Sequence, residues 1–173
     1  LSTYMKLGTV GLLAIGIFIV NPHLQMPPTT QYLKGGGPII PGPVWPYVCL
    51  TIACGAISGF HALIGSGTTP KMINSEADIR PIGFGTMLIE GFVGLLALVA
   101  ACTLLPDHYF IINAAADKYP ATQAALDQVA ATAQAVGEKT LVGRTGGSVT
   151  LAVGMAEIFR KLPGMSRMMS YWY

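Results

Sequence analysis

The chain has 173 residues, of which 52% are hydrophobic and 10% are charged, and its formal net charge is +2. Soluble domains carry about 25% charged residues, so the composition excludes an ordinary soluble protein and predicts a lipid bilayer as the surroundings. The basic residues form no stripe, which excludes a nucleic acid partner. The three histidines and three cysteines show no ligand spacing, and we therefore expect neither a metal nor a cofactor.

Four apolar segments predict membrane-spanning helices. They cover residues 3–20, 44–64, 82–105 and 146–159. The second and third reach the roughly 20 residues that cross the hydrocarbon layer. The fourth is short, and it is either half of a discontinuous helix or a whole helix that contains polar residues. The predicted fold class is therefore all-α, a polytopic membrane helix bundle.

The connections divide the chain into three regions. These are residues 1–105, with three spans and a broken segment at 65–72; residues 106–145, an extracytoplasmic loop; and residues 146–173, a short transmembrane segment and a truncated end. Within the loop, residues 120–136 space their apolar side chains helically and Gly137 follows, which predicts a surface helix and its stop. Because the chain starts at Leu1 rather than Met and ends without a turn signal, we expect a piece of a longer protein.

The positions of Lys and Arg predict the orientation of the spans, since cytoplasmic flanks are enriched in them. Alternating spans place Lys6, Lys71, Arg80, Arg160, Lys161 and Arg167 on one side. They place Lys34, Lys118, Lys139 and Arg144 on the other. The first group is the larger one, so we expect it to be cytoplasmic.

Residues 65–72 predict an interruption of the second helix. Gly65 and Gly67 can adopt positive φ, and Pro70 has no N–H to donate. Backbone groups freed in this way, together with nearby hydroxyls, can coordinate a cation or an anion, as in transporters with broken helices. The predicted substrate- or ion-binding residues are Ser66, Gly67, Thr68, Thr69 and Lys71. The alternative is an ordinary loop rich in Gly, Ser and Thr.

Glu90 lies well inside the third apolar segment, where an ionised carboxylate is costly unless it is protonated or paired. His61 lies near the inner end of the second segment, and imidazole exchanges a proton near physiological pH. On straight helices the two side chains differ in depth by about 7–8 Å, so direct contact between them stays open. We predict that Glu90, with His61, carries a coupling proton. The alternatives are a structural hydrogen bond for Glu90 and a satisfied histidine near the membrane interface.

Enzyme motifs are incomplete in this chain, and no catalytic residue is predicted. The segment from Gly65 to Lys71 lacks the Gly-Lys-Ser/Thr ending of a phosphate loop. Ser58 and His61 are three residues apart, but no third group orients them. An intramembrane enzyme would instead need a nucleophile–base contact such as Ser66 with His61. The charged turn with Glu76, Asp78 and Arg80 is most simply a solvated surface.

The stretch ACGAISGFHALIGSGTTPKM (residues 53–72), followed by Glu76, Asp78 and GFGTMLIEG (residues 83–91), resembles the carbon starvation protein A (CstA) family. NPHLQMPP (residues 21–28) and GMAEIFRKLPGM (residues 154–165) resemble it too. The resemblance implies a much longer, multi-pass protein of the bacterial inner membrane. It also implies nutrient uptake during carbon starvation, and kinship with the amino acid–polyamine–organocation transporters, whose cores contain broken helices.

The expected function is therefore secondary active transport, with proton-coupled uptake of pyruvate or small peptides and no enzyme activity. The expected partners are the lipid bilayer, the small solute and a proton or cation; a homo-oligomer stays open. Lys71 or Arg80 would meet a substrate carboxylate near the cytoplasmic exit. The alternative from another class is a non-transporting membrane subunit or a nutrient or starvation sensor.

Overall fold

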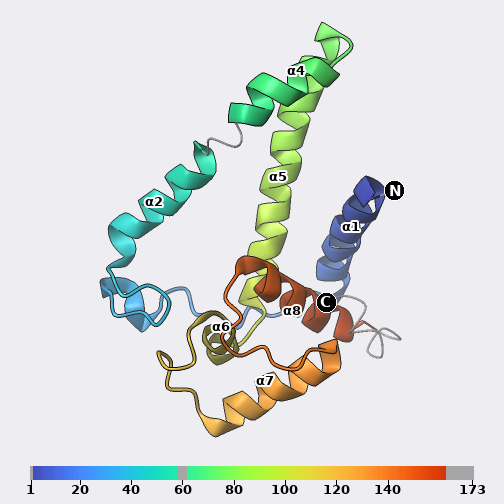
Figure 1. The fold of residues 1–173 in the computed structure, drawn as a ribbon. Helices are drawn as coiled ribbons and strands as arrows, with labels where there is room; N and C mark the ends of the chain where they lie inside the picture. The colour runs from blue at the N-terminus through green and yellow to red at the C-terminus, as the bar shows by residue number, and fades with distance from the viewer. Residues whose placement is uncertain (1, 58–61, 163–173) are drawn as a thin grey trace. The chain divides into compact units, whose positions relative to one another are not determined.

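The computed structural model describes residues 2–57 and 62–162 of the chain. Every regular element in these two ranges is helical and none is a strand, which confirms the predicted all-α class (Figure 1). The chain divides into two compact units: unit 1 comprises Leu1–Thr29 and Val93–Tyr173, and unit 2 comprises Thr30–Phe92.

Among its described residues, unit 1 contains four whole helices and the C-terminal part of a fifth. They are α1 (Ser2–Val20), α5 (Ile79–Cys102, from Val93 onward), α6 (Pro106–Asn113), α7 (Gln123–Val136) and α8 (Gly147–Arg160). α7 confirms the helix predicted before Gly137. Gly137 has φ 86°, a left-handed conformation that stops the helix, and its N–H donates to the carbonyl oxygens of Ala133 and Gln134.

The core of unit 1 lies between α6, α7 and α8. Ile112, Val129 and Val153, one from each helix, are almost completely buried there. Asn113 of α6 donates to the Thr150 hydroxyl of α8 across 2.8 Å, so the polar groups in this core are paired. The sequence placed α6 in a loop, because Pro106 and Asp107 at its start carry signals typical of a connection.

α8 packs across the C-terminal ends of α1 and α5. A Cβ at Gly154 would overlap the carbonyl oxygen of Ala100, and a Cβ at Gly16 would lie 2.9 Å from the Phe159 ring. The loop after α1 also reaches the end of α5, since the Gln25 N–H donates to the Cys102 carbonyl oxygen across 2.8 Å. The short transmembrane segment predicted at residues 146–159 contains α8, and its place in a membrane stays a prediction.

Unit 2 contains short helical elements and the first half of α5. They are η1 (Gln31–Lys34), α2 (Val44–Ala56), η2 (Ile64–Thr68), α4 (Thr69–Met72), η3 (Glu76–Asp78) and α5 as far as Phe92. α2 ends at Ala56, well before the predicted limit of residue 64, because Ile57 leaves the helical region at φ −121°, ψ 27°. Cys49 and Cys54 on α2 are exposed within the chain.

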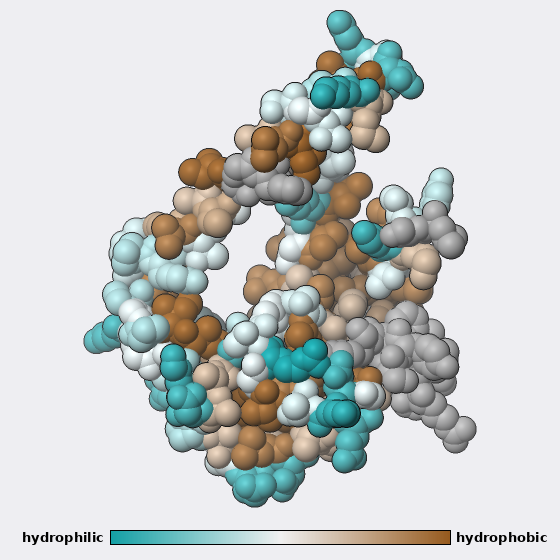
Figure 2. Space-filling model, in the orientation of Figure 1, coloured by the Kyte–Doolittle hydropathy of each residue, from teal (hydrophilic) through white to brown (hydrophobic). Residues whose placement is uncertain are grey.

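Two described helices are long and apolar enough to cross a membrane, Thr3–Val20 and Glu76–Cys102. Only 11% and 6% of their apolar windows are buried within the structure, so they do not act as the core helices of a soluble domain. Figure 2 shows hydrophobic residues along the visible side of α5, whereas hydrophilic residues gather at the turn that precedes it. Such exposed apolar helices are typical of chains that contact lipid or further helices.

Candidate functional site

The backbone stays helical at the segment where the sequence predicts a break. Ile64–Thr68 form a π-helical turn, in which the Thr69 N–H donates to the Ile64 carbonyl oxygen, and α4 follows directly. Neither Gly65 nor Gly67 has a positive φ. The wide turn takes up the irregularity without left-handed glycines, and π turns of this kind are frequent at functional sites.

This turn presents acceptor oxygens. The Ser66 hydroxyl donates to the Ala62 carbonyl oxygen across 2.6 Å, and because its hydrogen is used there, this exposed oxygen can only accept from a further partner. Pro70 has no N–H to offer to the carbonyl oxygens of Gly65 and Ser66, which lie one turn before it. The sequence left open whether this segment binds a cation or an anion. Because the turn offers acceptor oxygens, it is better suited to a cation, or to a solute group that donates hydrogen bonds, than to an anion.

A groove of about 740 Å³ lies beside the turn, within unit 2. Ile64, Ile79 and Ile82 form its apolar lining, and Thr69, Glu76 and Thr86 are among its polar groups. A volume in the range of about 300–1,000 Å³ suits a small-molecule ligand. The groove combines a mostly apolar wall with a few convergent polar groups, which is the composition expected of a solute site.

Glu90 lies on the helix face that borders this groove. Successive residues of a helix turn by about 100° around its axis, so Glu90 lies about 40° from Thr86 and about 20° from Gly83 around α5. Along the axis, Glu90 is roughly 6 Å beyond Thr86. Thr86 and Gly83 both line the groove. Because Cα–Cβ bonds tilt toward the helix N-terminus, the Glu90 side chain leans toward Thr86. Glu90 is exposed in the chain, and among the described residues none donates a hydrogen bond to it.

The structure brings together only part of the predicted set. Of that set Thr69 alone lines the groove, whereas Ser66, Gly67, Thr68 and Lys71 do not. His61 and Ser58 lie outside the described residues. The pairing of His61 with Glu90 and the contacts of His61 with Ser58 or Ser66 therefore stay untested predictions.

Sequence reasoning missed Asn74, Ser75 and Thr86 as lining residues, and it treated Glu76 as a surface charge. Thr86 could have been found, because it precedes Glu90 by four residues and so shares its face. Asn74, Ser75 and Glu76 could not, because their place depends on how the turn folds back on α5.

Comparison with known proteins gives one family for the whole chain. The family described as "Carbon starvation protein CstA" matches residues 1–173. The chain is 48% identical to the "Peptide transporter CstA" of Bacillus subtilis (strain 168) and 44% identical to the protein of the same name from Escherichia coli (strain K12). It is 40% identical to the "Pyruvate/proton symporter BtsT" of Escherichia coli (strain K12).

Each of these alignments covers 100% of the chain, but only 29%, 27% and 29% of the respective relatives. The chain thus spans less than a third of the length of the curated relatives it matches. No solved structure matches it.

Proposed function

Because the chain belongs to the carbon starvation protein CstA family, we propose that it contributes to a proton-coupled transporter that takes up pyruvate or small peptides across the bacterial inner membrane. Two kinds of curated relative support this proposal, one named a peptide transporter and one a pyruvate/proton symporter. The names describe transport and no enzymatic reaction, and no catalytic residue is proposed.

The proposed setting is a multi-pass helix bundle of the kind found in the amino acid–polyamine–organocation transporters. At 1.5 Å per residue, α1 is about 28 Å long and α5 about 36 Å, enough for a hydrocarbon layer of about 30 Å. α2 is only about 20 Å long, so it would cross together with the segment that follows it. The π-helical turn at Ile64–Thr68, which is irregular but stays helical, is proposed to take the place that a broken helix has in this kind of bundle.

The position of Glu90 carries the proposal. It lies about 16 Å from the start of α5 and about 18 Å from its end, which is midplane depth for a spanning helix. An ionised carboxylate at that depth costs about 3 kcal/mol even on scales measured by membrane insertion. Binding a proton removes this cost, so we assign Glu90 the coupling proton, with His61 as its proposed partner.

The proposed solute path is the groove beside Glu90. Thr69 is the proposed contact from the groove lining. Ser66, Gly67 and Thr68, on the adjoining π-helical turn but outside that lining, are proposed to contact a cation through carbonyl and hydroxyl oxygens. Lys71, exposed in the last turn of α4, is proposed to meet a substrate carboxylate as it leaves. Thr86 is added to this set because it lies between the groove and Glu90.

The test is solute accumulation in proteoliposomes that contain the protein carrying this chain. Under an inwardly directed proton gradient, the wild type should accumulate pyruvate or a dipeptide above its external concentration. The Glu90→Gln variant should reach only equilibration, because its side chain cannot take up the driving proton.

Asp117→Asn is the matched control, since it neutralises an exposed carboxylate outside the proposed site. It should accumulate solute like the wild type. Gradient-driven accumulation by Glu90→Gln at the wild-type level would refute the coupling role. No uptake of either solute by the wild type would favour a non-transporting subunit or sensor.

A further inference from the structure

We infer that unit 1 contains a second binding site, a polar hollow that takes the carboxylate group of a small solute. The polar hollow has a volume of about 480 Å³ and lies where the loop after α1, the end of α5 and helices α6, α7 and α8 meet. The polar groups used here are Gln25, His108, Gln128, Glu157, Arg160 and Lys161. None of them lines the groove beside Glu90.

The charge of the polar hollow suits one negative group. Arg160 and Lys161 face a single carboxylate, Glu157, which leaves an excess of one positive charge. Arg160 Nη2 donates to Glu157 Oε2 across 2.8 Å, while 53% of the Arg160 side chain stays exposed. Among the described residues Lys161 forms no ion pair with its side chain. Glu157 also disfavours doubly charged anions, so a monocarboxylate fits better than phosphate.

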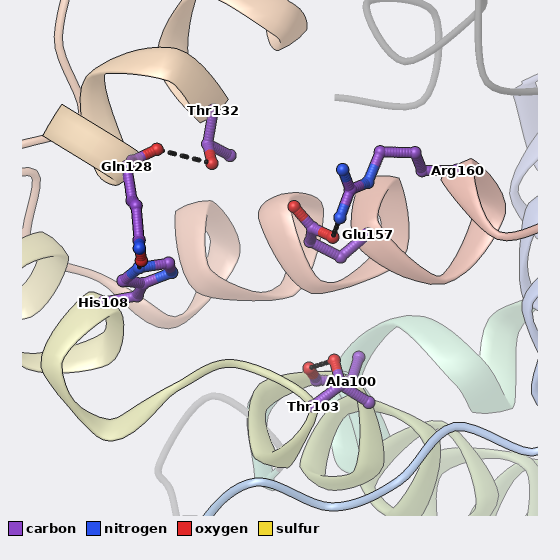
Figure 3. A network of polar contacts seen from close by, with 7 residues as sticks. All are labelled: Ala100, Thr103, His108, Gln128, Thr132, Glu157 and Arg160. Atoms are coloured by element: carbon purple, nitrogen blue, oxygen red, sulfur yellow. Dashed lines mark hydrogen bonds and ion pairs between the residues drawn. The ribbon is translucent and has the colours of Figure 1, made fainter. Parts of the chain in front are cut away.

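The hydrogen-bond donors also converge on this space. Figure 3 shows the His108–Gln128 pair, and on α8 the Glu157–Arg160 pair. His108 Nε2 lies 2.9 Å from Gln128 Oε1. With Nε2 protonated, this contact occupies the amide oxygen of Gln128 and leaves its NH₂ group as a donor. Thr132 also lines the hollow, but its hydroxyl already donates to the main-chain oxygen of Gln128 across 3.0 Å, so it is not counted among the donors for a ligand.

Arg160 is the proposed principal contact. A guanidinium presents five N–H donors in a planar fork that matches the two oxygens of a carboxylate. The ion pair between Arg160 and Glu157, three residues earlier on α8, is solvent-exposed and therefore weak. It uses one guanidinium nitrogen, so the remaining N–H groups of Arg160 are available to a ligand. Lys161 and the Gln128 amide would hold the second oxygen. Glu157 thus acts as a positioning residue that holds Arg160 in place.

The test measures Lys161 directly in the purified protein that carries this chain. The rate at which an amine-reactive reagent modifies Lys161 is followed by mass spectrometry, with and without alanyl-alanine or pyruvate. The choice of these two probes rests on the proposed function. Bound carboxylate should slow modification of Lys161 but not of Lys118, an exposed lysine outside the hollow. Protection by alanyl-alanine alone would identify the ligand as a peptide, and protection by pyruvate alone would identify it as a 2-oxo acid.

Three comparisons decide the proposal. Alanyl-alanine amide and pyruvamide, which lack the carboxylate, should give no protection. Arg160→Gln should raise the probe concentration needed for half-protection about tenfold, the loss expected for one charge-assisted hydrogen bond. Glu157→Gln should preserve protection, because it removes a negative charge and keeps a hydrogen-bonding partner for Arg160.

Equal protection by the amides or by inorganic phosphate, equal slowing at Lys118, or no protection of Lys161 would each overturn the carboxylate site. The Glu90→Gln variant separates the two proposals. It should keep the protection of Lys161 even though it loses gradient-driven accumulation, so failure of one proposal does not imitate failure of the other.

Discussion

The Glu90 carboxylate lies at the centre of a face of small and polar residues on α5. Gly83, Thr86, Gly94 and Ala97 each lie within about 40° of Glu90 on this face. Large apolar side chains such as Phe84, Leu88 and Leu95 point elsewhere and are exposed. A face of small residues allows another helix or a solute to come close to the backbone. Glu90 is thus positioned to be covered by protein or water and kept away from lipid.

Gly154 is a residue on which the packing of unit 1 depends. Gly154→Ala should destabilise the protein by about 1–3 kcal/mol, because the new Cβ would overlap the carbonyl oxygen of Ala100 and force α8 away from α5. The expected readout is a lower midpoint of thermal unfolding in detergent.

Gly147→Ala on the same helix is the control, since a Cβ there meets nothing within 4 Å. It should leave the midpoint unchanged or raise it slightly through helix propensity. If both substitutions had the same effect, the close contact between Gly154 and Ala100 would not exist in the protein.

At the scale of the elements, the end of α7 depends on one left-handed residue. Gly137→Ala should cost roughly 1 kcal/mol, because a Cβ is strained at φ 86°. Asn tolerates this conformation better, so Gly137→Asn should recover part of the stability. Thermal unfolding of the two variants checks the prediction. If the Gly137→Asn variant were no more stable than Gly137→Ala, the helix would not end in a left-handed residue at this position.

Elements with strong local signals were predictable from the sequence. The apolar runs of α1 and α5 and the helical spacing of α7 before Gly137 depend on neighbours in the chain, and the structure contains all three helices. α6 and the placement of α8 depend on distant contacts, such as Asn113 with Thr150 and Gly154 with Ala100. No local pattern encodes those pairs, which is why α6 and the packing of α8 against α5 were not predicted.

The site shows the same division. Glu90 stands out in the sequence because a carboxylate interrupts an apolar run. The groove beside it depends on how the π-helical turn and α4 lie against the start of α5, so Asn74 and Ser75 were not predicted. The polar hollow was missed altogether, because Gln25, His108 and Arg160 come from three distant parts of the chain.

At the scale of the whole molecule, the predicted orientation depends on whether residues 146–159 cross the membrane. Arg160 and Lys161 line the same hollow as His108 and Gln128. The alternation of spans had placed them on the opposite side from residues 106–145. If α8 lies on the same side as His108 and Gln128, the count of basic residues no longer favours a cytoplasmic location for Lys6 and Lys71.

Cysteine labelling tests this arrangement. In a background without Cys49, Cys54 and Cys102, the variants Lys118→Cys and Lys161→Cys should react with a membrane-impermeant maleimide from the same side of sealed vesicles. Lys71→Cys should react from the other side if Glu76–Cys102 crosses the membrane once, as its length and composition allow. Vesicles of opposite orientation provide the control. Labelling of Lys161→Cys together with Lys71→Cys would restore a fourth span between them.

The most direct test of Glu90 as the proton carrier is solute-driven proton movement. Proteoliposomes loaded with a pH-sensitive dye receive pyruvate, or the dipeptide if that is the solute accumulated, with no gradient imposed. The wild type should acidify the interior. Glu90→Gln should cause no acidification while it still exchanges labelled for unlabelled solute. Acidification by Glu90→Gln at the wild-type rate would contradict the assignment of the coupling proton to this carboxylate.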